Sequence, residues 1–138
     1  MRVLFDTNVL LDALLHRDTA HLYSSALLVM VANQYIDAYV APHSLSNIYY
    51  ILRKDKNEEE RKQMISKILL YTKVVPIDNE IANNALNIPN ISDYEDALQY
   101  ACADAVHADF ICTNDSVFKD KEIKALTAAE LFQLLELP

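Results

Sequence analysis

The sequence of 138 residues contains no glycine and no tryptophan, and it has only two cysteines. Without glycine, the chain cannot form the glycine-rich loops that bind phosphates in P-loop and dinucleotide-binding proteins. Cys102 and Cys112 lie in apolar surroundings and are too few for a disulfide framework, which indicates a reduced, cytoplasmic protein. Turns must then rely on Asn and Asp, which tolerate the left-handed backbone best. The expected turn residues are Asn33, Asn57, Asn79, Asn87 and Asn90.

Long hydrophobic runs are also absent. The longest, Ala26 to Ala32, is far too short to span a bilayer. Met1-Arg2 leads directly into an apolar segment, so we expect neither a signal peptide nor a membrane partner. Apolar residues make up 52% of the chain and charged residues 23%, a balance typical of globular proteins. The length predicts one domain, residues 1–138, with a single core.

Positive charge is missing from a long stretch of the chain, because Val74 to Phe118 contains no Lys or Arg. This acidic stretch suits a cation site, in a chain whose net charge is −8. The preceding segment is rich in basic residues, which could contact phosphates or could form a solvated helix paired with neighbouring glutamates. These basic residues are Arg53, Lys54, Lys56, Arg61, Lys62, Lys67 and Lys73.

Short apolar runs alternate with amphipathic segments along the whole chain. The apolar runs predict strands at residues 2–6, 38–41, 74–77, 110–112 and 123–126. Helices are predicted at residues 6–16, 58–72 and 80–86, and after Asp18, Pro42, Ser92 and Thr127. Strands that alternate with helices imply a parallel sheet covered by helices on both faces, which is the α/β class.

Aspartates follow two of the predicted strands. Asp6 comes directly after Val3-Leu4-Phe5, and Asp115 closely follows the strand at residues 110–112. Open α/β sheets bind ligands at the carboxyl ends of their strands, where neighbouring connections leave toward opposite faces. If the first strand pairs with the strand at 110–112, both aspartates lie at such a point.

A third acid, Asp96, lies near the start of the helix that Ser92 is expected to cap, since Ser92 and Glu95 have capping-box spacing. Carboxylates gathered in one place repel one another unless a cation is present. Oxygen ligands favour Mg²⁺ or Mn²⁺ over zinc, and such an ion activates water beside a phosphate. The sequence therefore predicts metal-dependent hydrolysis of a phosphodiester, with Asp6, Asp96 and Asp115 as the acids.

Each polar residue also has a purely structural interpretation. Asp6 and Asp96 could serve only as helix-terminal acids, and Asp93 fits that role better than the role of a ligand. Asp12, four residues after Asn8 on one helix face, could reach the edge of the site or be solvated. The histidines show no metal-ligand spacing, so we expect them to be structural or exposed; they are His16, His21, His43 and His107.

Taken together, three segments resemble the PIN domain, the VapC-like nuclease fold found in the toxin half of many bacterial toxin–antitoxin pairs and in RNA-processing nucleases. Residues 6–12 (DTNVLLD) resemble its opening motif, residues 96–101 (DALQYA) its acidic helix, and residues 113–115 (TND) its late motif. Their order and spacing cover nearly the whole chain. The resemblance implies a three-layer α/β/α sandwich around a parallel sheet of about five strands.

The resemblance further implies cleavage of RNA that depends on Mg²⁺ or Mn²⁺. Asp6, Asp96 and Asp115 match the family's acidic metal-binding positions. Thr113 matches a hydroxyl residue that orients the site, and Asn8 matches a polar partner of Asp6.

Partners are implied in the same way. A toxin-like member of the family is held in check by an antitoxin protein, and PIN-like proteins are often homodimers. Tyr49, Tyr50 and residues 22–30 could form a face for such a partner, but core packing explains them as well.

One position departs from the family. PIN domains usually supply another acid, a glutamate, from the helix after the second strand, and here Asn47 occupies that position. An amide oxygen can bind Mg²⁺, but it brings no charge and cannot act as a base. The departure predicts weaker metal binding, or cleavage that needs a high metal concentration or prefers Mn²⁺.

Two alternatives to a ribonuclease stay open. A PIN fold that has lost cleavage and binds RNA or protein would account for Asn47. An aspartyl-phosphate phosphotransferase or receiver-like domain would use Asp6 as a nucleophile. The haloacid-dehalogenase type would then need an acid where Asn8 stands, and a receiver-like domain would need an acidic pair by the first strand and a late lysine.

Overall fold

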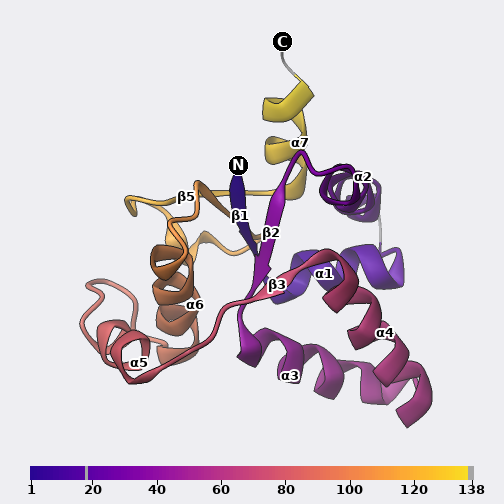
Figure 1. Ribbon diagram of the computed structural model, residues 1–138, viewed down its shortest axis with the longest axis horizontal. Helices are drawn as coiled ribbons and strands as arrows, with labels where there is room; N and C mark the ends of the chain where they lie inside the picture. The colour runs from indigo at the N-terminus through magenta and orange to yellow at the C-terminus, as the bar shows by residue number, and fades with distance from the viewer. Residues whose placement is uncertain (18, 137–138) are drawn as a thin grey trace.

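In the computed structural model, which describes residues 1–17 and 19–136, five parallel strands form one sheet in the order β3-β2-β1-β4-β5. Helices cover both faces of this sheet (Figure 1), so the predicted three-layer α/β/α sandwich is confirmed. The strands are β1 (Arg2–Phe5), β2 (Asp37–Val40), β3 (Lys73–Val74), β4 (Phe110–Cys112) and β5 (Lys124–Leu126).

The helices divide between the two faces (Figure 1). One face carries α1 (Thr7–Leu15), α2 (Ala20–Ala32), α3 (Pro42–Ile51), α4 (Glu58–Tyr71) and α7 (Ala128–Glu136). The other carries α5 (Asn79–Leu86) and α6 (Tyr94–Ala105). Two 3-10 helices are η1 (Leu52–Lys54) and η2 (Ser116–Phe118). Within the described ranges, no helix combines the length and apolarity needed to cross a membrane.

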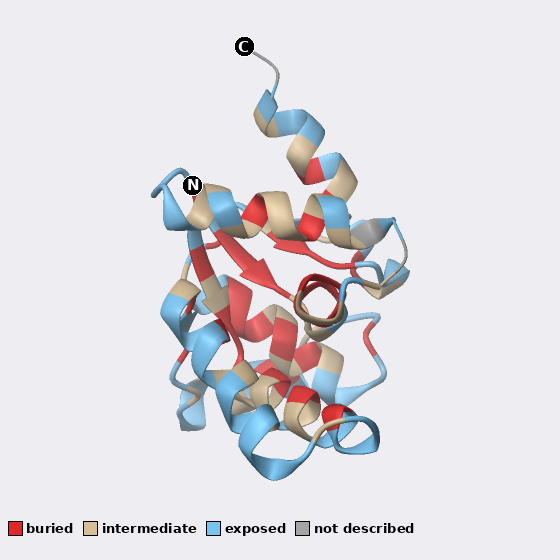
Figure 2. Ribbon diagram, turned by 90° about the vertical axis from the view of Figure 1, so that its right-hand side faces the viewer, coloured by how far each residue is buried: buried red, intermediate tan, exposed pale blue. Residues whose placement is uncertain are grey.

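The central strand β1 is buried on both faces because successive side chains of a strand point in opposite directions. Val3 and Phe5 belong to the core beneath α1 and α2, whereas Leu4 belongs to the core beneath α6. Figure 2 shows the buried residues concentrated in the strands and along the inner faces of the helices. Ala97 and Ala101 of α6 are part of this core, so small side chains line the helix face that packs on the sheet.

β1 pairs with β2 on one side and with β4 on the other, which makes the boundary between β1 and β4 the switch point of the sheet. Phe5 lies opposite Cys112 at the carboxyl end of this pair, and the Asp6 amide donates to the Cys112 carbonyl at 2.9 Å. The predicted pairing of the first strand with residues 110–112 is confirmed. The segments after β1 and β4 consequently leave the sheet side by side.

Two predictions about helix and strand ends are wrong. Asp93, not Ser92, is the N-cap of α6, and its side chain accepts a hydrogen bond from a backbone amide of the first turn at 3.2 Å. The third strand is Lys73–Val74 rather than residues 74–77, because Pro76 has no amide to donate to a strand ladder. The cap expected at Asp18 lies outside the described residues.

The prediction about turn residues is also mostly wrong. Of the five asparagines expected in left-handed turns, Asn90 has a positive φ, 64°, whereas Asn57 caps α4 with extended backbone. Elsewhere in the described residues, positive φ values occur at His16, Gln34, His107 and Asp120. His16 takes this conformation as the C-cap of α1, so the requirement for a helix end outweighs the intrinsic preference of the residue.

Candidate active site

Asp6 lies at the junction of β1 and α1, where it is the N-cap of α1. Its Oδ1 atom accepts hydrogen bonds from the Thr7 amide at 2.8 Å and from Gln99 Nε2 at 3.3 Å. Burial raises the pKa of Asp6, and hydrogen bonds from Thr113 and Thr7 partly offset this shift. The negative charge of Asp115 raises the pKa further. Asp6 thus caps a helix and also faces a second carboxylate.

The buried hydroxyl of Thr113 connects these two acids. Its Oγ1 atom donates to Asp6 Oδ2 at 2.7 Å and accepts a hydrogen bond from the Asp115 amide at 3.0 Å. Asp115 itself is exposed and caps η2, because its Oδ1 atom accepts from the Val117 amide at 3.0 Å. One hydroxyl therefore sets the relative positions of the residues that follow β1 and β4.

Asp96 lies in the first turn of α6 and is influenced by the same acids. Burial raises the pKa of Asp96 from 3.8 to about 6, and the charges of Asp93, Asp115 and Asp6 raise it as well. Within residues 1–17 and 19–136, no positive charge lowers the pKa of Asp96. Asp6, Asp96 and Asp115, from three separate segments, therefore act on one another through their charges.

Gln99, which is not among the site residues predicted from the sequence, is part of this arrangement. The side chain is buried, it donates to Asp6, and its Oε1 atom accepts a hydrogen bond from Ser44 Oγ at 3.2 Å. Gln99 lies three residues after Asp96 on α6, hence on the same helix face. A long polar side chain within a stripe of small apolar residues is the signal that could have identified it.

Asn47, at the position where the family resemblance implies an acid, contacts the start of α6. Its Nδ2 atom donates to the carboxylate of Glu95. Glu95 therefore does not form the predicted capping box with Ser92, because Asp93 takes the N-cap position. His43, one turn before Asn47, interacts electrostatically with both Glu95 and Asp6.

Asp12 is neither solvated nor a member of the acidic group. It is 7% exposed, forms an ion pair with Arg17 at 2.8 Å, and accepts a hydrogen bond from Asn114 Nδ2 at 3.1 Å. Arg17 also donates to the backbone carbonyl of Asn8, whose side chain is exposed. Asp12 thus anchors the loop that carries Asp115, and Arg17 is occupied by Asp12 rather than by the three acids.

The oxygen atoms are not already arranged as a metal-ion ligand set. Among the described residues, no three His, Cys, Asp or Glu side chains are close enough together to hold a metal ion. The cysteines offer no alternative, because burial raises the pKa of Cys102 to about 11 and also raises that of the fully buried Cys112. The chemistry of this site therefore depends on its carboxylates rather than on its cysteines.

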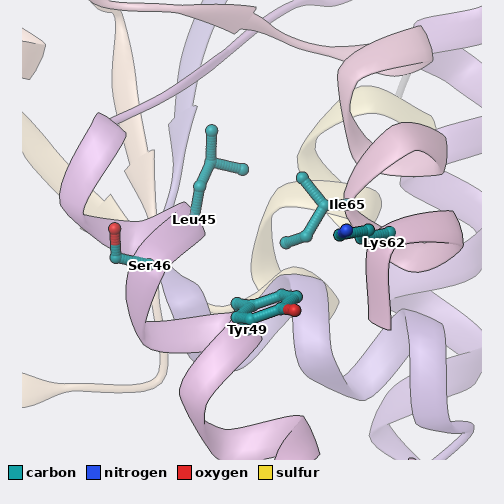
Figure 3. Close-up of a pocket in the computed structure, with 5 residues that line it drawn as sticks. All are labelled: Leu45, Ser46, Tyr49, Lys62 and Ile65. Atoms are coloured by element: carbon teal, nitrogen blue, oxygen red, sulfur yellow. The ribbon is translucent and has the colours of Figure 1, made fainter. Parts of the chain in front are cut away.

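A groove of about 380 Å³ lies apart from the aspartates, between α3 and α4 (Figure 3). It is lined by Leu45, Ser46, Tyr49, Lys62 and Ile65. Figure 3 shows the Tyr49 ring and the Ile65 side chain facing one another across it. None of these five lining residues is acidic, so the groove has the character of a contact surface rather than of a catalytic site.

Comparison with known families identifies the fold. A family model described as a PIN domain matches residues 2–116, which include all three aspartates. The chain belongs to the PIN-domain family. This membership leaves the aspartyl-phosphate alternative without support.

Several known proteins match the chain over most of its length. Ribonuclease VapC1 of Aquifex aeolicus (strain VF5) is 27% identical over 134 residues, covering 94% of this chain and 92% of that protein. The structure of VapBC2 from Rickettsia felis, bound to a DNA fragment from its promoter, has a TM-score of 0.71 at 16% identity, covering 92% and 98% of the two chains. VapC20 from Mycobacterium tuberculosis, a Sarcin-Ricin loop cleaving toxin, has a TM-score of 0.69 at 12% identity, covering 88% and 95%.

The first prediction concerns the anchor at Asp12. Asp12→Ala removes the acceptor for Arg17 and Asn114, so the free energy of unfolding should fall by about 2 kcal/mol. Asp12→Asn keeps an acceptor oxygen and should lose less. Urea denaturation of both variants measures the difference, and equal losses would contradict the assigned contacts.

The second prediction concerns pH. The pKa of Asp96 is higher in the folded chain, about 6, than its usual 3.8, so the folded state binds more protons. Stability from this residue is therefore greatest below about pH 4 and declines as the pH rises to about 6. Asp96→Asn should be more stable than the unaltered chain at pH 7 in EDTA, by a margin that shrinks toward pH 4.

Thermal denaturation across this pH range tests the Asp96 prediction. Asp104→Asn makes the same chemical change near the other end of α6 and serves as the control. A stability difference for Asp96→Asn that stays constant from pH 4 to pH 7 would show that folding does not raise the pKa of Asp96.

Proposed function

We propose that this PIN-domain chain is a divalent-metal-dependent ribonuclease of a toxin–antitoxin pair. The observation that carries the proposal is the meeting of Asp6 and Asp115 at the paired ends of β1 and β4, where the Thr113 hydroxyl donates to Asp6 and accepts from the Asp115 amide. In keeping with this geometry, burial and the charges of Asp93, Asp115 and Asp6 raise the pKa of Asp96 to about 6. Without a bound ion, the repulsion among these carboxylates destabilises the folded chain. A divalent cation removes this repulsion.

The residues fit Mg²⁺ or Mn²⁺ by their chemistry. Asp6, Asp96 and Asp115 would hold the ion, because hard cations prefer carboxylate oxygens. When bound, the ion supplies charge that stabilises the phosphate and activates a water molecule. Thr113 and Gln99 hold the Asp6 carboxylate in one orientation, which reduces the reorganisation needed on binding.

RNA is the proposed substrate because of the relatives. Ribonuclease VapC1 matches nearly the full length of the chain, and VapC20 is described as cleaving the Sarcin-Ricin loop. The basic residues before β3 give little support for RNA binding. Lys62 pairs with Glu58 at 2.7 Å, and Arg61 lies over the Tyr49 ring. These pairs favour the solvated-helix interpretation of this segment.

An antitoxin is the proposed protein partner. The similar structures include VapBC2 and FitAB, each bound to DNA; FitAB has a TM-score of 0.71 at 18% identity, covering 91% of this chain and 94% of that one. Exposed apolar residues on the helical face offer a surface, including Leu22 and Val29 of α2 and Leu70 of α4. The homodimer, the cytoplasmic location and the single-domain organisation stay predictions.

A second candidate is a PIN fold that binds RNA or protein without cleaving it. The neutral amide of Asn47, at the position where the family resemblance implies an acid, favours this candidate. The two candidates share the fold and the partner surface and differ in turnover.

The third prediction separates these two functions. The purified chain should cleave single-stranded RNA with Mg²⁺ or Mn²⁺, and EDTA should stop the cleavage. Asp6→Asn should lower the rate by roughly 100-fold or more, because it removes charge from the proposed ion position. Asp104→Asn should cleave like the unaltered chain.

Gel analysis of labelled RNA fragments measures this. RNA binding without metal-dependent cleavage in the unaltered chain would support the binding module instead. Cleavage that persists in Asp6→Asn would indicate a contaminating nuclease.

A further inference from the structure

The Glu95 carboxylate forms its hydrogen bond outside its own helix. Asp93 accepts the hydrogen bond from the first turn of α6, so the Glu95 carboxylate is not used for capping. The Glu95 carboxylate instead accepts a hydrogen bond from the side-chain amide of Asn47 on α3, 48 residues away in the chain. The contact holds one carboxylate oxygen of an otherwise exposed glutamate against the helix where the family resemblance implies an acid.

His43 supplies a second observation for the same place. His43 and Asn47 are four residues apart on α3, so they share one helix face. His43 lies within electrostatic range of both the Glu95 and Asp6 charges. Within residues 1–17 and 19–136, its Nδ1 atom is buried without a hydrogen-bond partner. The charges of Glu95 and Asp6 therefore act on the same imidazole.

We propose that Glu95, positioned by Asn47, supplies from α6 the negative charge that α3 lacks at residue 47. The inference rests on the proposed metal-dependent function and adds one residue to its site. The charge of Glu95 also acts on Asp96, which places it in the same electrostatic group as the three aspartates. The family's acid is thus relocated to a neighbouring helix, and the amide at residue 47 orients it.

The first test measures Mn²⁺ affinity of the full chain by calorimetry and by electron paramagnetic resonance, without RNA. Glu95→Gln should weaken binding about 10-fold, the effect expected when a group supporting an ion is removed. Glu80→Gln is the matched control, because Glu80 is the second residue of α5 after the cap Asp78, as Glu95 is the second residue of α6 after Asp93. This control should bind Mn²⁺ like the unaltered chain.

The second test exchanges the two chemical groups. Asn47→Asp combined with Glu95→Gln keeps both side-chain lengths and reverses the amide–carboxylate pair. The double variant should recover most of the affinity lost in Glu95→Gln, since the charge returns to the site from α3. Thermal denaturation of each variant verifies that the fold is retained before the affinities are compared.

The outcomes distinguish this proposal from the one on which it rests. Equal Mn²⁺ affinity in Glu95→Gln and Glu80→Gln would overturn the role of Glu95 and leave the three-aspartate site intact. A loss that Asn47→Asp does not reverse would also overturn it, because the effect would not follow the charge. Absence of Mn²⁺ binding in the unaltered chain would overturn both proposals.

Discussion

The parallel pairing of β1 with β4 determines where the acids of this protein lie. It places the carboxyl end of β1 beside that of β4, which follows β1 by more than 100 residues in the sequence. The Thr113 hydroxyl then joins Asp6 to the Asp115 backbone across the pair, and α6 brings Asp96 and Gln99 against them. Residues that no local interaction would gather are held together by one register of backbone hydrogen bonds.

Among the residues that the structure describes, no lysine or arginine forms an ion pair with Asp6, Asp96 or Asp115. Arg17 is close to Asp6 in the sequence, but it forms its ion pair with Asp12. The segment from Val74 to Phe118 contains no Lys or Arg. Electrostatic repulsion therefore opposes folding around the site, while the apolar cores on both faces of the sheet favour it. A site built in this way gains stability from a bound cation, which couples occupancy to the stability of the fold.

Much of this arrangement could be predicted from the chain alone. Apolar runs located the strands, and the strand ends located Asp6 and Asp115, because strand ends and sheet order follow simple rules. The contacts of Gln99, His43 and Glu95 could not be predicted in the same way. Each depends on how α3 and α6 approach one another, and local spacing carries no information about that distance. Glu95 had a valid local partner in Ser92, and the tertiary contact with Asn47 prevailed.

Two faces of α3 contact different parts of the protein. Through Ser44 and Gln99 it is connected to Asp6, and through Leu45 and Tyr49 it forms a wall of the groove against α4. A ten-residue helix moves as a rigid unit, so neither face can shift alone. Anything that displaces α3 by occupying the groove would also displace the support of Asp6. A ligand that displaced α3 from the groove side would change the affinity at Asp6, and occupancy at Asp6 would then change the affinity of the groove by the same factor.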